Sequence, residues 1–237
     1  MRKDLVLEFD IDAQPDDVTC GPTCLQALYR YYNDEVPLRQ VVHEVKQLKN
    51  GGTLAVMLGN HALRRGYKAT IYSYNLNLFD PSWAGFSRKK IIERLKRQMA
   101  FKYKRRKLQI ASKAYIQFLE EGGDLQFAEL DAELISSYLA RSRPILTGLS
   151  ATYLYGTQRE VPQFDIYDDI KGEPAGHFVV ISGYDEKKRC AYLADPMTPN
   201  PIGKGRVYGV SFTRLINSIM LGIVTYDANL LIIEPNK

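Results

Sequence analysis

Residues 14–32 read QPDDVTCGPTCLQALYRYY, a polar loop that runs directly into an apolar helical pattern. Proline is tolerated in the first turn of a helix, so Pro22 supports a helix that begins close to Cys20. Apolar side chains then recur at helical spacing, at Cys24, Leu25, Leu28, Tyr29 and Tyr32. The stretch therefore predicts a buried helix with a cysteine at its N-terminus.

The position of Cys20 predicts a reactive thiol. Unpaired backbone N–H groups and the positive end of the helix dipole stabilise a thiolate at a helix N-terminus. Cys24 lies one turn further along the same face, where a small buried residue is the simpler interpretation. With Cys190 the chain has three cysteines, which is too few for a disulfide scaffold. We therefore expect reduced cysteines, with Cys20 as the candidate nucleophile.

A nucleophilic thiol needs a base, and the chain has three histidines, His43, His61 and His177. The first two lie inside predicted helices, where a histidine without a chemical role is the better interpretation. His177 differs, because it opens the strand pattern of residues 176–184 directly after a flexible, acidic stretch. This placement predicts a histidine at a strand end on the rim of a cleft.

A carboxylate that accepts the other imidazole N–H would orient such a base. Asp195 ends the strand pattern of residues 190–195. The charged run at residues 185–189 predicts a hairpin turn between that strand and the one that His177 opens. The hairpin would make Asp195 and His177 neighbours.

An acyl-transfer site also needs hydrogen-bond donors for the oxyanion. The backbone N–H of Cys20 is one candidate. The side-chain amide of Gln14, six residues upstream in the loop before the helix, is within reach to be the second.

These residues resemble the signature of a known family. Gln14 and Cys20 in QPDDVTCGPTCLQAL, His177 in GHFVVISGYD and Asp195 in LADP look like the double-glycine peptidases. These enzymes are the bacteriocin-processing branch of the papain-like cysteine peptidases, and the similarity is to their stand-alone relatives in particular. It covers three blocks in the right order, at residues 14–32, 144–150 and 176–234.

The resemblance implies a role for each of the four residues. Cys20 would be the nucleophile and His177 the general base and acid. Asp195 would be the orienting carboxylate, and Gln14 the side chain of the oxyanion hole. The implied activity is that of a thiol peptidase, which needs no cofactor. A metal is not expected either, since Cys20 and Cys24 have no evident set of further ligands.

The remaining patterns predict an α+β chain. Helical periodicity is present at residues 37–49, 53–65, 87–121, 131–143 and 211–220. Strand patterns occur at residues 5–11, 67–74, 144–150, 176–184, 190–195 and 229–234. Together with the resemblance, this predicts one papain-like domain over residues 1–237. A helical lobe of about residues 12–143, with an insertion at 75–130, would pack on an antiparallel β lobe of about residues 144–237.

The net charge of +5 conceals an uneven distribution. Residues 88–107 hold eleven Lys and Arg and one Glu, a local charge of +10, whereas the rest of the chain has a net charge of −5. A solvated amphipathic face is the default interpretation of this predicted basic helix. Among acidic partners we favour a leader peptide over RNA or a membrane surface, because a peptide fits a peptidase and no nucleic-acid-reading motif is present.

The sequence thus predicts a cysteine peptidase that cleaves a peptide at a double-glycine or small-residue junction through a thioester. An acyl or peptidyl transferase would use the same residues, and an inactive peptide-binding module would keep only the cleft. No stretch approaches the roughly 20 apolar residues of a membrane span, and Glu8 and Asp10 interrupt the apolar opening before a signal peptide could form. We therefore expect a cytoplasmic protein, whose substrate and oligomeric state the sequence leaves open.

Overall fold

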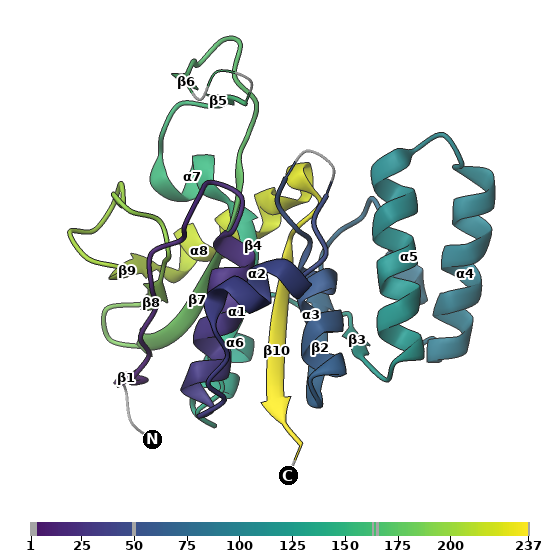
Figure 1. Cartoon of the computed structure of the whole chain (residues 1–237), viewed down its shortest axis with the longest axis horizontal. Coiled ribbons are helices and arrows are strands. Elements are labelled where there is room, and N and C mark those ends of the chain that lie inside the picture. Colours follow the sequence, from purple (N-terminus) through teal and green to yellow (C-terminus); the bar gives the residue numbers. More distant parts are fainter. Residues whose placement is uncertain (1–3, 49–50, 163, 165, 237) are drawn as a thin grey trace.

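A computed structural model describes residues 4–48, 51–162, 164 and 166–236. Across these residues, an eight-stranded sheet has the order β3-β2-β10-β4-β7-β8-β9, with β1 paired to β7 (Figure 1). Neighbouring strands pair antiparallel, apart from the parallel pair of β2 and β3. The strands are β1 (Asp4–Val6), β2 (Tyr67–Ser73), β3 (Asp124–Gln126), β4 (Ile145–Ser150), β7 (Gly176–Asp185), β8 (Cys190–Ala194), β9 (Val207–Ser211) and β10 (Asn229–Pro235).

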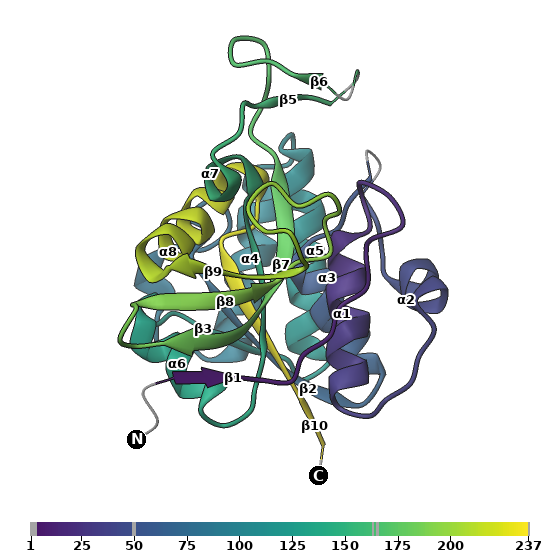
Figure 2. The same ribbon diagram turned by 90° about the vertical axis from the view of Figure 1, so that its left-hand side faces the viewer.

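Helices cover both faces of this sheet (Figure 2). On one face, α1 (Cys20–Tyr31) packs on β7, and α3 (Ala55–Arg64) packs on β2 and β10. On the other face, α8 (Phe212–Leu221) packs on β4. The central strands β4 and β10 are therefore buried along almost their whole length, as their apolar sequences require. The remaining helices are α2 (Leu38–Glu44), α4 (Arg88–Phe101), α5 (Arg106–Glu120), α6 (Ala132–Leu139), α7 (Ala151–Tyr155), η1 (Pro81–Trp83) and η2 (Gly222–Thr225).

The predicted hairpin between β7 and β8 is present. Asp185 pairs with Cys190 across its end, and the Asp185 carboxylate accepts the backbone N–H of Lys188 at 2.9 Å. Along its first half, β7 also pairs with β4, which places His177 opposite Leu149. Pairing with β4 therefore fixes the first residues of β7 in the sheet, and β8 pairs with β7 from Val180 onward.

The α+β class is confirmed, but the sheet draws on both halves of the chain. β2 and β3 come from the first 143 residues, and β2 pairs along its whole length with the last strand, β10. This pairing is stable because β2 alternates buried and more exposed residues, with its buried face toward α3. The division into a helical and a β lobe stays a prediction.

One predicted element is wrong. The basic helix expected from residue 87 to 121 is two antiparallel helices, α4 and α5, joined by residues 102–105 (Figure 1). A single helix of that length would expose its apolar stripe, whereas folding back buries Ile91 and Leu95 of α4 and Leu108 of α5. Tyr103 lies in the turn and is exposed. The basic segment 88–107 therefore covers α4, the turn and the start of α5.

Short elements without a strong pattern were not predicted from the sequence: β3, α7, β9 and the two-stranded arm of β5 (Glu160–Val161) and β6 (Ile166–Tyr167). The arm projects beyond the end of the sheet at which β7 begins (Figures 1 and 2). Within the described ranges, no helix combines the length and the apolar character needed to cross a bilayer.

Candidate active site

The N-terminus of α1, where Cys20 lies, has no side-chain cap. The residue before it, Thr19, does not cap the helix with its side chain, because its hydroxyl oxygen accepts the backbone N–H of Asp16 at 3.4 Å instead. The first turn contains no acidic residue. Its first N–H groups have no acceptor within the helix, so they and the helix dipole act on the Cys20 sulfur.

Gly21 lets this helix end approach its surroundings closely. A Cβ atom on Gly21 would lie 2.7 Å from the Thr53 side chain and 3.2 Å from the Phe178 ring. Phe178 directly follows His177 in β7, so this contact fixes the distance between the helix that carries Cys20 and the strand that carries His177. The close approach therefore depends on glycine at this position.

His177 and Asp195 form a direct contact. The Nε2 atom of His177 lies 2.8 Å from Oδ1 of Asp195. Both side chains are buried, with 3% and 0% of their surfaces exposed. Because Nε2 donates to the carboxylate, the other ring nitrogen, Nδ1, is left for Cys20, whose side chain is a hydrogen-bond partner of His177. The structure thus brings Cys20, His177 and Asp195 together.

The charges of these groups support one another. Burial alone lowers the pKa of His177, but the charge of Cys20 and hydrogen bonds with Asp195 and Cys20 raise the pKa to about 10. Burial alone raises the pKa of Asp195, but the hydrogen bond and charge of His177 lower it to about 2. At neutral pH, the arrangement therefore favours an imidazolium that is hydrogen-bonded to the Asp195 carboxylate.

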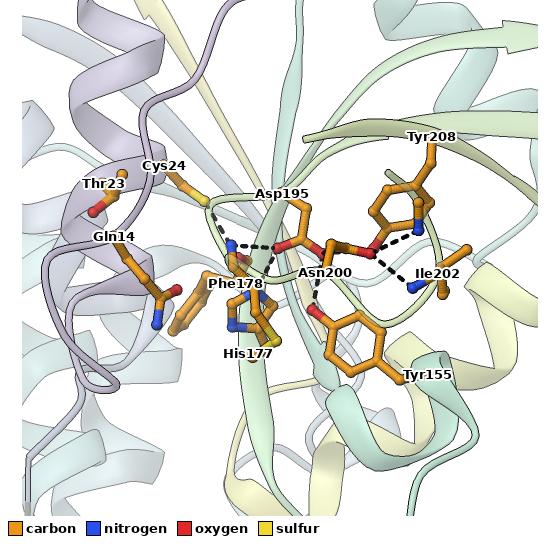
Figure 3. Close-up of polar contacts among 12 residues, drawn as sticks. Gln14, Thr23, Cys24, Tyr155, His177, Phe178, Asp195, Asn200, Ile202 and Tyr208 are labelled. Atoms are coloured by element: carbon orange, nitrogen blue, oxygen red, sulfur yellow. Dashed lines mark hydrogen bonds and ion pairs between the residues drawn. The ribbon is translucent and has the colours of Figure 1, made fainter. Parts of the chain in front are cut away.

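Three residues that the sequence did not indicate surround the other oxygen of Asp195 (Figure 3). Oδ2 accepts hydrogen bonds from the Tyr155 hydroxyl at 2.8 Å, the Tyr208 hydroxyl at 2.5 Å and the Asn200 amide at 2.9 Å. They come from α7, from β9 and from the loop after β8. No sequence motif marks these residues. The chain has sixteen tyrosines, and nothing in the local sequence distinguishes these two from the others.

Gln14 is held beside the site through its backbone. Its N–H donates to the carbonyl oxygen of Pro196 at 2.9 Å, which links its loop to the residue that follows Asp195. The side-chain Nε2 donates to the Asp16 carbonyl oxygen at 2.9 Å. An amide nitrogen carries two hydrogens, so the Asp16 contact engages only one of the two N–H groups of the Gln14 side chain.

The other cysteines and histidines have different surroundings. Cys24 is fully buried and its thiol donates to the Phe178 carbonyl oxygen at 3.3 Å. Burial and the charges of Cys20 and Asp195 raise the Cys24 pKa, so this thiol stays neutral. His61 is buried between Tyr29 and Glu44, and His43 is exposed on α2. Of the described residues, no three His, Cys, Asp or Glu side chains cluster as a metal site would require.

Sequence comparison identifies a family. The sequence model of the Peptidase_C39 like family matches residues 6–215, which is most of the chain. The match includes all four residues singled out above. No curated protein sequence matches the chain significantly.

Several solved structures are similar to this chain, and one with a TM-score above 0.5 shows the fold. A putative C39-like peptidase from Bacillus anthracis superimposes with a TM-score of 0.51 at 13% identity, covering 98% of each chain. A double glycine motif protease from an AMS/PCAT transporter, in complex with the leader peptide, gives a TM-score of 0.46 at 15% identity, covering 98% of this chain and 94% of the other. Xylellain, a cysteine protease from Xylella fastidiosa, gives 0.45 at 14% identity, covering 100% and 87%.

Proposed function

Because the chain belongs to the Peptidase_C39 like family and is a cysteine peptidase with a papain-like fold, we propose that Cys20, His177, Asp195 and Gln14 cleave a peptide through a thioester. The observation that carries this proposal is the contact of a thiol at a helix N-terminus with a buried, carboxylate-bound imidazole. Such a pair supplies both the nucleophile and the proton that the first step needs.

In the first step, the Cys20 sulfur attacks the carbonyl carbon of the scissile peptide bond. The carbonyl oxygen takes the negative charge and accepts hydrogen bonds from the Cys20 backbone N–H and the Gln14 amide. His177 then gives its proton to the nitrogen of the leaving amine. The C–N bond breaks, and the acyl group remains on Cys20 as a thioester.

In the second step, neutral His177 removes a proton from a water molecule, whose oxygen attacks the thioester carbonyl. The C–S bond breaks, the carboxylic acid product leaves, and the imidazolium and thiolate are restored. Nε2 of His177 stays hydrogen-bonded to Asp195 through both steps. Nδ1 is therefore the atom that donates and accepts each transferred proton.

The cleavage site is proposed to be a double-glycine or other small-residue junction. Cys20 is 8% exposed and His177 is 3% exposed, so only a small part of the reacting residues is accessible to a substrate. A residue without a side chain lets a substrate backbone approach such atoms most closely.

The rest of the substrate is proposed to be an acidic leader segment that contacts the basic segment 88–107. Of its eleven Lys and Arg side chains, all within the described ranges, only Lys96 and Arg97 have a carboxylate partner. The unpaired charges would attract an acidic peptide. A cytoplasmic setting is also proposed, because the three cysteines are free and a thiol nucleophile must stay reduced.

The test is cleavage of a synthetic peptide with an acidic leader and a Gly-Gly junction, followed by mass spectrometry. We expect two products that sum to the substrate plus one water. Cys20→Ala should lower the rate by at least about a thousandfold. Cys24→Ala is the matched control, one helical turn away, and should cleave at nearly the wild-type rate.

Two results would contradict the proposal. One is cleavage that survives Cys20→Ala, and the other is a wild-type protein that cleaves none of a panel of small-residue junctions. A product carrying an added amine, formed when an amine is supplied, would instead assign the same thioester to a transferase.

A further inference from the structure

The carboxylate of Asp195 is fully buried and accepts five hydrogen bonds. Oδ1 accepts from His177 and from the backbone N–H of Met197, at 2.8 and 3.0 Å. Oδ2 accepts from the hydroxyls of Tyr155 and Tyr208 and from the amide of Asn200. Two hydrogen bonds would occupy both lone pairs of Oδ2. The third donor is therefore more than the burial of this oxygen requires.

Building on the proposed function, we propose that Tyr155, Tyr208 and Asn200 are positioning residues that keep Asp195 ionised and aimed at His177. These three residues are called the donor cluster below. Their hydrogen bonds reach the reaction through Asp195, because all three donate to Oδ2 while His177 donates to Oδ1 (Figure 3).

The chemistry of the donor cluster fits an anion. A buried carboxylate without donors would take up a proton, because burial disfavours the charged form. Burial and the charge of Asp195 raise the pKa of both Tyr155 and Tyr208 far above the usual value of a phenol, so both stay protonated donors. The amide nitrogen of Asn200 can only donate.

The geometry of the donor cluster also fixes direction. Three donors converge on Oδ2 from a helix, a strand and a loop, which prevents the carboxylate from rotating about its Cβ–Cγ bond. Oδ1 therefore stays aimed at Nε2 of His177. The ring of Tyr155 additionally lies 6.1 Å from the His177 ring, tilted by 52°.

Asn200 ties the cluster to the loop that follows Asp195. Its Oδ1 accepts the backbone N–H groups of Ile202 and Gly203, at 2.9 and 3.1 Å, while its Nδ2 donates to Asp195. The side chain is thus held at both ends. Asn200→Asp replaces only the amide nitrogen by oxygen. It keeps the hydrogen bonds of the turn, but the contact with Asp195 becomes a repulsion between two carboxylates.

The titratable groups that face Asp195 are His177 on β7, Tyr155 on α7 and Tyr208 on β9, together with Cys20 and Cys24 on α1. With weaker donors, Asp195 takes up a proton at a higher pH. A neutral Asp195 no longer supports the imidazolium, and an unsupported imidazolium no longer supports the Cys20 thiolate. The reactivity of Cys20 therefore falls with decreasing pH in a range that depends on the donor cluster. This part of its pH profile is called the acid limb below.

The experiment measures the rate of Cys20 alkylation by iodoacetamide between pH 3 and 8. It compares the full-length wild type with the double variant Tyr155→Phe, Tyr208→Phe, which keeps both rings. We expect the acid limb of the double variant to move up by about one pH unit, which is about a tenfold lower rate at pH values below the limbs of both proteins. Tyr32→Phe is the matched control, because it removes a phenol whose hydroxyl donates to the Ile233 carbonyl oxygen, away from the site. Its limb should stay in place.

Asn200→Asp is the second variant, for the case in which the double variant does not fold. It should move the limb up as well, since a second carboxylate would face Asp195 Oδ2. A limb that stays in place in the folded variants would overturn this inference while leaving the proposed function intact. If His177→Ala also leaves Cys20 alkylation unchanged, the proposed function itself fails, so the two failures are distinguishable.

Discussion

Asp227 is a buried carboxyl group that lies against two strand glycines, Gly148 and Gly176. The Thr225 hydroxyl donates to its Oδ2 at 3.2 Å, while no described group pairs with Oδ1. Burial raises the pKa of Asp227 to about 7, although the Thr225 hydrogen bond and the Lys107 charge lower it. The folded protein therefore holds a neutral carboxyl group here in acid and a buried charge in alkali.

We expect Asp227→Asn to stabilise the protein only at higher pH. The folded-state pKa is raised above the unfolded value of about 3.9, so the wild type loses stability as the pH rises from about 4 to above 7. The amide of the variant carries no charge at either pH. The substitution should therefore raise the free energy of unfolding by about 1–3 kcal/mol more at pH 8 than at pH 4. Urea unfolding at both pH values measures it. An equal effect of the substitution at pH 4 and pH 8 would contradict the account.

Side chains differ in how far the sequence reveals their roles. Cys20 and His177 were candidates because a helix start and a strand start are readable from local patterns. Asp195 followed from the hairpin, since a short turn fixes which strand ends meet. Tyr155 and Tyr208 could not be found in this way. Their contact with Asp195 depends on two short elements, α7, which packs on β4 and β7, and β9, which pairs with β8.

At the scale of elements, the α4–α5 hairpin is the part of the chain with the strongest charge. Its turn exposes Phe101 and Tyr103, at 87% and 68%, beside a run of cations at residues 104–107. The sequence predicted its helical content and its charge, but not the break at residues 102–105. Helical periodicity continues through the turn, and only the gain from burying α4 against α5 sets the fold-back.

We expect this hairpin to contribute to substrate binding rather than to the chemical step. Lys104→Gln, Arg105→Gln and Arg106→Gln together should raise KM for a peptide with an acidic leader by about 5- to 10-fold in low salt, with kcat unchanged. The difference should shrink above about 0.5 M salt, where exposed charges are screened. A peptide of the same junction with a neutral leader is the control. A lower kcat at unchanged KM would count against the assigned role.

At the scale of the whole molecule, the sheet joins segments that are distant in sequence around one site. β10 at the C-terminus lies between β2 and β4, and β1 near the N-terminus pairs with the far half of β7 (Figure 1). Most of the longer strands were predictable from apolar runs. Apart from the β7–β8 hairpin, their order was not, because an apolar strand that is buried on both faces carries no signal for its neighbour. The result is a rigid β7, on which the start of α1 can rest.

The most direct measurement of the central claim is the alkylation rate of Cys20 at pH 6, followed by mass spectrometry of the peptide that contains it. An unperturbed thiol with a pKa of about 8.5 is only roughly 0.3% ionised at this pH. With His177 protonated up to a pKa of about 10, we predict that Cys20 reacts at least about tenfold faster than free cysteine and that His177→Ala removes the excess. A Cys20 that reacts no faster than free cysteine, with a rate indifferent to His177→Ala, would contradict the account.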